Sequence, residues 1–294
     1  MAPRWRSLPA VADPALQAPF RWEGEHIAAD LPGGRVLFAT RRGGISTGPF
    51  ASLNLGRKTA DDGANVDANR ERLAAAVGVP WERFAYGIQV HGASVRRATE
   101  PPGAARPAAE EDGQATALAD VAALVFVADC LPVLLCAERS GERSDDEREA
   151  RGREASGRGR SAVAALHGGW RGLAGGIVAE GVAALRELGA GGPVAAAIGP
   201  GARGCCYEVG EEVHAAFAGV PGARAAGRNL DLPAVARHRL GEAGVEAVHD
   251  TGLCTICAGD ELFFSHRRDH GVTGRQAGVV WPDDRAAQAG AGAA

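Results

Sequence analysis

The chain has 294 residues, with 32 basic and 36 acidic side chains and a net charge of -4 at pH 7. This balance excludes a chain-wide electrostatic attraction to nucleic acid or to an anionic membrane, so we expect neither as a partner. The length allows one large domain or two small ones, either with a full hydrophobic core.

Residues 1–20 are rich in proline and alanine, and residues 285–294 are a low-complexity Ala/Gly/Gln tail. We therefore predict a flexible N-terminal extension, a flexible tail, and a single catalytic domain over residues 21–284. The N-terminus carries early arginines but no apolar stretch before a cleavage site, so the sequence predicts a cytoplasmic protein.

Residues 121–136 form the most apolar window of the chain. The window is shorter than the roughly 20 residues that a membrane span needs, and Asp129 and Pro132 interrupt it. We interpret it as a buried strand.

Strand-like and helix-like segments alternate along the chain. Short apolar runs that end in polar, Gly or Pro residues predict strands at 34–41, 123–130, 161–167, 194–200 and 246–254. Apolar residues at helical spacing predict helices at 65–78, 172–189 and 232–244. This alternation favours an α/β or α+β fold over an all-β fold.

Residues 138–161 are almost entirely charged or small and lie between two predicted core strands. A segment without an apolar face cannot pack onto a core, so we predict a solvated, disordered loop insertion.

The segment "SAVAALHGGWRGLAGGI" (161–177) predicts a strand, a tight turn and the start of a helix. His167 stands at the strand end, Gly168 and Gly169 form the turn, and Arg171 opens the helix. Such turns place ligands and anions in open sheets, although a surface histidine beside a close-packed glycine turn gives the same pattern.

Two further strand-like segments end on potential metal ligands: "FAYGIQVHG" reaches His91 and "ALVFVADC" ends on Cys130. With His167 they make two imidazoles and one thiolate, the donors that zinc prefers. Three protein ligands would leave a fourth position open, as in a catalytic site. Their spacing alone does not show that the three residues meet in space.

The remaining cysteines give a weaker pattern. Cys254 and Cys257 form a C-x-x-C motif, which is typical of half a zinc site or of a redox pair. Cys205 and Cys206 make a poor second pair, because side chains of adjacent residues diverge. We interpret the cysteines of these two segments as structural thiols and place Cys205 and Cys206 on a turn that lines the pocket.

Six segments, in order, resemble the signature motifs of the multicopper polyphenol oxidase (laccase-like) family. That family is also described as purine nucleoside phosphorylases, and one bacterial branch as a peptidoglycan editing factor. The segments are "ATRRGGISTGPFASLNLG" (39–56), "QVHG" (89–92), "ADCLPVLL" (128–135), "HGGWRG" (167–172), "IGPGARGCCYEVG" (198–210) and "FFSHRRDHGVTGRQAG" (263–278).

The resemblance implies a single α+β domain with mixed β-sheets flanked by helices. It also implies one zinc ion per chain, bound by His91, Cys130 and His167. Copper binding is possible in the family, but the residue inventory does not support it: the chain has eight histidines and no H-x-H pair for a trinuclear copper cluster. This chain departs from the family at Val127, where Thr is usual, and at Ala236, where Asn is common.

Phosphorolysis requires fixed positive charge and N–H donors around phosphate. Arg171 is our candidate catalytic cation, alongside the three metal-binding residues. For substrate binding we propose Arg41, Asn54 and the N–H groups at Gly168 and Gly169, although Arg41 and Asn54 are also suited to shaping turns.

The three residues Arg267, Arg268 and Asp269 follow one another in the last motif. Neighbouring charges of opposite sign also form internal ion pairs, and we interpret these residues as an ion-pair cluster rather than a site.

Three functions remain open from the sequence. The first is a zinc-dependent purine nucleoside phosphorylase acting on adenosine, inosine or methylthioadenosine with phosphate, with adenosine deaminase side activity. The second is a cysteine hydrolase that edits peptidoglycan precursors, with Cys130 as nucleophile and His167 or His91 as base. The third is a non-catalytic, metal-stabilised binding protein. The sequence leaves the oligomeric state open.

Overall fold

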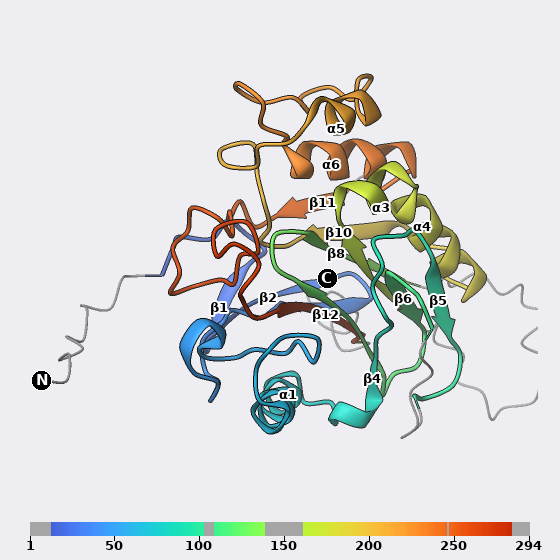
Figure 1. Cartoon of the computed structure of the whole chain (residues 1–294). Coiled ribbons are helices and arrows are strands. Elements are labelled where there is room, and N and C mark those ends of the chain that lie inside the picture. The colour runs from blue at the N-terminus through green and yellow to red at the C-terminus, as the bar shows by residue number, and fades with distance from the viewer. Residues whose placement is uncertain (1–12, 103–108, 139–160, 246, 284–294) are drawn as a thin grey trace, which may run out of the picture.

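The computed structural model describes residues 13–102, 109–138, 161–245 and 247–283. Within these residues twelve strands form two six-stranded sheets, and helices cover them on both sides (Figure 1). One edge pair of the first sheet and both edge pairs of the second are parallel, and all other pairs are antiparallel. The expected α+β fold with mixed sheets in one domain is confirmed.

The first sheet has the order β1 (Arg21–Glu23), β2 (His26–Leu31), β3 (Gly34–Phe38), β12 (Gln276–Pro282), β7 (Ala122–Val127), β4 (Phe84–Ala85). The second has the order β11 (Ala247–Asp250), β10 (Val194–Ile198), β8 (Leu131–Ala137), β9 (Ala162–Gly168), β6 (Gly113–Thr116), β5 (Val95–Ala98). The α-helices are α1 (Gly63–Val77), α3 (Trp170–Ala174), α4 (Ile177–Glu187), α5 (Glu211–Ala216) and α6 (Leu232–Glu242). Short 3-10 helices lie at Gly48–Phe50 and Trp81–Arg83.

The two sheets pack face to face over an apolar layer to which Phe38, Val125 and Leu134 belong. The other face of the first sheet packs on α1, and the other face of the second sheet packs on α4 and α6. The result is four layers, helix, sheet, sheet and helix, which Figure 1 shows from bottom to top. Burial of both faces explains why the strands are nearly continuous apolar runs.

The apolar window 121–136 is two strands rather than the one buried strand predicted from its composition. β7 belongs to the first sheet and β8 to the second. The chain changes sheets at Ala128–Cys130, where Asp129 has the left-handed φ of 91°. A tight reversal of this kind places Cys130 at the junction of the two sheets.

The predicted helix 172–189 is also two elements. It divides into α3 and α4 at Gly175 and Gly176, and Gly176 has a φ of 90°. A positive φ stops the regular helical hydrogen bonding and is readily adopted by glycine. The predicted helix 65–78 is found as α1, which Asp62 caps at its start and Gly78 at its end.

Residues 13–20, from the segment predicted as a flexible extension, are packed on the domain. Phe20 is 6% exposed and Leu16 packs against the layer between the sheets. The indole N–H of Trp22 donates to the carbonyl of Pro14. The predictions for residues 1–12, for 139–160 of the charged loop and for the tail 285–294 fall outside the described residues.

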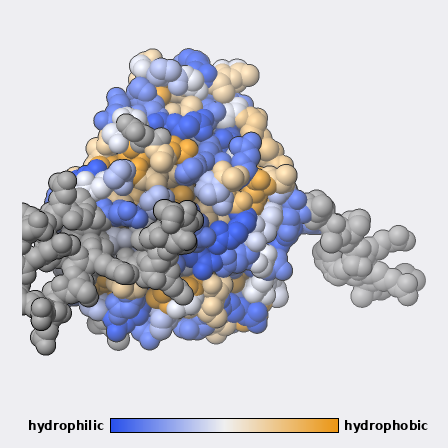
Figure 2. All heavy atoms as spheres, turned by 180° about the vertical axis from the view of Figure 1, so that it is seen from behind, coloured by the Kyte–Doolittle hydropathy of each residue, from blue (hydrophilic) through white to orange (hydrophobic). Residues whose placement is uncertain are grey.

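Figure 2 shows polar and apolar residues interspersed on the opposite face of the molecule. Large exposed apolar side chains among the described residues are Ile45, Val90 and Val272. Within the described part of the chain, each helix is too short or too polar to cross a membrane.

Candidate active site

The three predicted metal-binding residues meet at the junction of the two sheets. One donor atom each of His91, Cys130 and His167 lies within 4.8 Å of the others. Cys130 follows β7, His167 lies near the end of β9, and His91 lies in the loop between β4 and β5. The two imidazole rings have centroids 4.9 Å apart. The fold thus brings together residues that the sequence could only mark as separate strand ends.

A buried carboxylate, Asp112, holds two of these residues in place. It accepts the backbone N–H groups of Val90, His91 and Gly92 at 3.1, 2.9 and 2.7 Å. Nδ1 of His167 lies 2.8 Å from Oδ1 of the same carboxylate. Because an ionised carboxylate only accepts, Nδ1 of His167 carries the proton and Nε2 is left as the metal-binding nitrogen.

The electrostatics at Cys130 favour the thiolate. Burial opposes ionisation of Cys130, but the adjacent His167 and His91 outweigh it and lower the thiol pKa. Burial likewise acts to lower the pKa of His167, and the neighbouring Cys130 and Asp112 raise it overall. The thiolate is the form of cysteine that binds metals and acts as a nucleophile.

Gly169 packs tightly against the centre, where a side chain would crowd its neighbours. A Cβ atom would lie 3.1 Å from the Cys130 sulfur and 3.2 Å from Cδ2 of His91. At Gly168 a Cβ would lie 2.9 Å from the carbonyl oxygen of Leu131. These two residues therefore allow close packing of β9 against the centre.

The expected phosphate-binding N–H groups at this turn are not supported by the geometry. The N–H of Gly169 donates to the carbonyl of His167 at 3.0 Å, so it is engaged within the turn. Neither Gly168 nor Gly169 lines the cavity. The helix that follows, α3, has only five residues.

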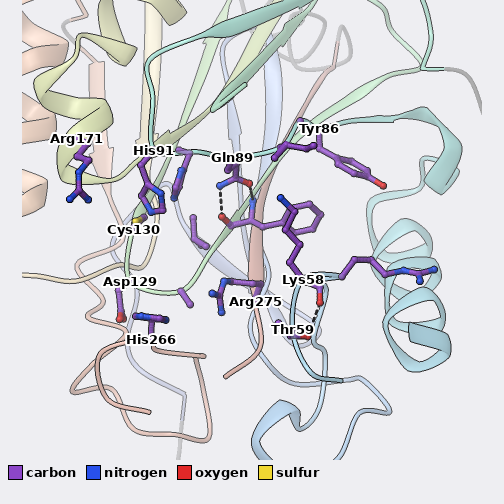
Figure 3. A pocket seen from close by; sticks show the side chains of 18 of the residues that line it. Lys58, Thr59, Tyr86, Gln89, His91, Asp129, Cys130, Arg171, His266 and Arg275 are labelled. Carbon is purple, nitrogen blue, oxygen red and sulfur yellow. Dashed lines mark hydrogen bonds between the residues drawn. The ribbon is translucent and has the colours of Figure 1, made fainter. Parts of the chain in front are cut away.

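A cavity of about 490 Å³ opens beside the three metal-binding residues. Figure 3 shows His91 and Cys130 together with Arg171 on one side, and Lys58 and Tyr86 across the cavity. Its aromatic lining residues are Tyr86, Phe126, Trp170 and Tyr207, and its cationic ones are Arg57, Lys58, Arg70, Arg171, Arg267 and Arg275. Flat apolar walls with excess positive charge suit a planar base that carries, or binds beside, an anion.

Asp129, the one carboxylate among the described lining residues, is already partnered. It accepts the hydroxyl of Thr255 at 2.6 Å and the backbone N–H of Arg267 at 2.7 Å. Its charge therefore holds the wall of the cavity together.

Two of the lining cations are available to a ligand. Among the described residues, the guanidinium of Arg171 and the ammonium of Lys58 form no hydrogen bond or ion pair. Arg171 instead lies over the Trp170 ring, 4.4 Å from its centroid. Arg70, in contrast, donates to the carbonyl of Leu55 through two nitrogens.

Gln89 joins the loop that carries His91 to the first sheet. Its side-chain Nε2 donates to the carbonyl of Phe126 at 2.7 Å, and its Oε1 accepts the Phe126 N–H at 2.8 Å (Figure 3). The roles of Gln89 and Asp112 are not evident from the sequence alone. Gln89 stands in the "QVHG" motif, but the only signal for Asp112 was a carboxylate directly before a strand.

Arg41 was expected to contact substrate, but it does not line the cavity. Its guanidinium donates to the carbonyls of Ala51 and Asp260 and lies over the Phe264 ring. These contacts join two loops of the domain, so the geometry gives Arg41 a structural role.

Asn54 also lies behind the cavity wall and is fully buried. Its Oδ1 accepts the N–H groups of Gly56 at 3.0 Å and Arg275 at 2.9 Å. Its Nδ2 donates to the hydroxyl of Thr59 at 2.9 Å. Its Nδ2 also donates to Asp61 at 2.9 Å. Because Gly56, Thr59 and Arg275 line the cavity, Asn54 positions the wall without lining the interior itself.

The predicted ion-pair cluster at 267–269 is divided between two roles. Arg268 forms an ion pair with Asp269 at 2.7 Å, as expected. Arg267 lines the cavity with Tyr207, whose ring lies 5.1 Å from its guanidinium carbon.

The four cysteines interpreted as structural thiols form a second cluster. The sulfurs of Cys205, Cys206, Cys254 and Cys257 all lie within 4.8 Å of one another. The expectation that the two adjacent cysteines diverge was wrong, because the turn that carries them directs both sulfurs to one point. None of the four lines the cavity; Tyr207, next in sequence, does.

Comparison with known proteins gives a family and close structural neighbours. Residues 35–143 and 156–283 match the model of a family described as multi-copper polyphenol oxidoreductase laccase. The unmatched residues 144–155 fall within the charged segment. The structure resembles a Neisseria meningitidis protein (TM-score 0.70, 35% identity, 88% of this chain and 99% of that one). It also resembles YlmD from Geobacillus stearothermophilus (TM-score 0.74, 31% identity, 90% and 99%).

Curated relatives carry the name purine nucleoside phosphorylase. One from Mycobacterium tuberculosis is 37% identical over 253 residues, which cover 84% of this chain and 91% of the relative. Another, from Pseudomonas aeruginosa, is 38% identical over 264 residues, covering 85% and 94%.

Proposed function

Because the chain belongs to the multi-copper polyphenol oxidoreductase laccase family, we propose that it is a zinc-dependent purine nucleoside phosphorylase. The substrates would be adenosine, inosine or methylthioadenosine with inorganic phosphate, and the products a free base and a pentose 1-phosphate. One observation carries the proposal: a triad of metal donors lies in an aromatic-walled cavity that holds two unpaired cations. The names of the curated relatives support the same activity.

The residues at the centre fit a zinc ion. Two imidazoles and one thiolate within 4.8 Å of one another are a donor set that zinc favours, and Asp112 orients His167 as carboxylates commonly orient metal-bound histidines. When bound to His91, Cys130 and His167, zinc would supply a Lewis acid with a coordination position open to substrate or water.

The residue inventory does not fit multicopper oxidation. In the described part of the chain, two groups of side chains could hold a metal, and neither contains more than two histidines. A trinuclear copper cluster built mainly from histidines has no counterpart here, so the family's description does not transfer as an activity.

The cavity walls would hold the nucleoside. Tyr86, Phe126, Trp170 and Tyr207 offer ring faces and edges to a purine, which stacks on aromatic side chains. Burial of the base would exclude water from the glycosidic bond, so that phosphate rather than water reaches the ribose.

Arg171 would bind the phosphate. In phosphorolysis a phosphate oxygen forms a bond to C1′ of the ribose as the bond from C1′ to the base breaks, and the base leaves with the bonding electrons and takes up a proton. Cations fixed beside the phosphate offset its charge and orient the attacking oxygen. Arg171 lies on the same side as the metal centre, and Lys58 lies across the cavity (Figure 3).

One observation favours a second function, hydrolysis of a substrate by a cysteine nucleophile. Cys130, His167 and Asp112 form a chain in which a carboxylate orients an imidazole beside a thiol with a lowered pKa. This is the arrangement of an activated nucleophile. The same three groups explain a metal centre equally well, so metal dependence separates the two functions.

The test is a nucleoside turnover assay on the purified protein, with and without phosphate, after zinc loading and after chelation. We expect release of the free base only when both phosphate and metal are present. Deaminase side activity would appear as the formation of ammonia and inosine from adenosine. Metal-independent hydrolysis that a thiol reagent blocks would favour Cys130 as a nucleophile. Nucleoside binding without turnover would favour a non-catalytic binding protein.

A further inference from the structure

Four cysteine side chains converge at one edge of the second sheet, outside the cavity. Cys205 and Cys206 lie in the turn that follows β10, and Cys254 and Cys257 lie in the loop that follows β11. Their sulfurs all lie within 4.8 Å of one another, and those of Cys205 and Cys257 are 3.6 Å apart. Two loops separated by about fifty residues thus present four thiols to one point.

These separations fit a single tetrahedral ion. A Zn–S bond of about 2.3 Å sets neighbouring sulfurs of a tetrathiolate site about 3.8 Å apart. An iron–sulfur cluster of several irons needs wider spacing, because irons and sulfides lie between the thiolates. All-sulfur donor sets of this geometry are typical of structural zinc.

The loop that carries Cys254 is held in place by backbone hydrogen bonds. The carbonyl of Cys254 accepts the N–H of Ala258 at 3.0 Å, and the N–H of Thr255 donates to the carbonyl of Gly201 at 3.1 Å.

The opposite turn is anchored independently of any ion. The carbonyl of Arg203 accepts the N–H groups of Cys206 and Tyr207. The guanidinium of Arg203 forms two hydrogen bonds of 2.9 Å to Asp250, at the end of β11. Both halves of the cluster are therefore held in position by the protein itself.

We propose that Cys205, Cys206, Cys254 and Cys257 bind a second zinc ion, closed by four thiolates and separate from the catalytic centre. A site with four protein ligands has no open position, so its role is structural. The proposal does not rest on the nucleoside phosphorylase activity.

The second ion would fix one wall of the cavity. The turn that carries Cys205 and Cys206 continues into Tyr207, which lines the cavity. The loop on the other side carries Thr255, whose hydroxyl donates to Asp129, the neighbour of Cys130. A structural ion here therefore supports both the aromatic wall and the residue beside the metal centre.

The first test measures zinc content after zinc loading and gel filtration under reducing conditions. We expect about two zinc ions per chain in the wild type and about one in Cys130→Ala, which keeps only the tetrathiolate site. The double variant Cys254→Ser/Cys257→Ser should keep the other ion. Cys136→Ala, which removes a buried thiol in the layer between the sheets, is the matched control and should keep both.

The second test identifies the donors by cobalt substitution. The intensity of sulfur-to-cobalt charge transfer rises with the number of thiolates, so cobalt-loaded Cys130→Ala should absorb about four times as strongly as the double serine variant. If the double variant fails to fold, the spectrum of Cys130→Ala alone still reports whether a tetrathiolate site exists.

Three results would overturn the proposal. If Cys130→Ala folds but binds no zinc, the four cysteines do not form a zinc site. A disulfide between any two of the four cysteines in protein purified under reducing conditions would show that they serve another purpose. Bound iron instead of zinc, visible as colour and by elemental analysis, would contradict the identity of the metal.

Discussion

Nδ1 of His167 lies 2.8 Å from Oδ1 of Asp112, and this pairing fixes which nitrogen of His167 faces the candidate metal centre. The same carboxylate receives three backbone N–H groups from the loop that carries His91. A single buried acid thus sets the positions of two of the three candidate metal-binding residues.

Asp112→Asn should weaken zinc binding at the proposed catalytic centre by about 10- to 100-fold, the usual effect of removing a carboxylate that orients a metal-bound histidine. The amide can donate as well as accept, so it no longer holds His167 in one tautomer. Competition with a chromophoric chelator measures the affinity. Asp120→Asn makes the same change at an exposed position and should leave zinc affinity unaltered; equal affinity in both variants would show that Asp112 does not orient the centre.

Gly169→Ala should reduce zinc affinity by about tenfold or more while the protein stays folded, because the added methyl group presses on Cys130 and His91. Gly241→Ala, where an added Cβ meets nothing within 4 Å, is the control. Circular dichroism and the same chelator competition compare the two. Wild-type zinc affinity in Gly169→Ala would mean that the centre can shift to make room.

Arg171→Ala should lower kcat/KM for phosphate by an amount equivalent to about 2–4 kcal/mol, the size of one lost preorganised donor. Arg171→Lys should restore only part of the loss, since it keeps the charge but not the forked donor. Initial rates at varied phosphate measure the effect. Arg96→Ala, a substitution outside the cavity lining, is the control.

If Arg171→Ala leaves the KM for phosphate unchanged and reduces deamination of adenosine equally, Arg171 shapes the whole cavity through its contact with Trp170. The assignment to phosphate would then be wrong.

Asn54→Ala should lower the free energy of unfolding by about 3 kcal/mol, because it leaves buried N–H groups of Gly56 and Arg275 without an acceptor. It should also raise the KM for the nucleoside, since Gly56, Thr59 and Arg275 line the cavity. Urea denaturation and steady-state kinetics measure the two effects. Asn65→Ala, on the first turn of α1, should change stability by less than about 0.5 kcal/mol. A stable Asn54→Ala variant with normal KM would contradict the positioning role.

Local pattern predicted the secondary structure well where the chain continues regularly and poorly where it reverses. The helix 65–78 was found because the helical spacing of its apolar residues is a local signal. The crossing between sheets at Ala128–Cys130 was missed, because apolar composition does not reveal that Asp129 takes a left-handed φ. The periodicity of a strand does not indicate which sheet the strand joins.

The candidate site was predictable only in part for the same reason. His91, Cys130 and His167 each end a strand-like run, but their meeting depends on how the sheets pack. No sequence motif identifies Asp112, because its role depends on hydrogen bonds to the backbone of a loop about twenty residues away. The convergence of Cys205 with Cys254 depends on two turns whose geometry no local rule gives.

The most direct test of the central claim follows phosphate itself, by ³¹P NMR of the zinc-loaded protein with inosine or adenosine and inorganic phosphate. The account predicts that the phosphate signal is replaced by that of ribose 1-phosphate as the free base accumulates in equal amount. Cys130→Ala should give no conversion. Release of base with the phosphate signal unchanged, or conversion at the wild-type rate by Cys130→Ala, would contradict a phosphorylase centred on His91, Cys130 and His167.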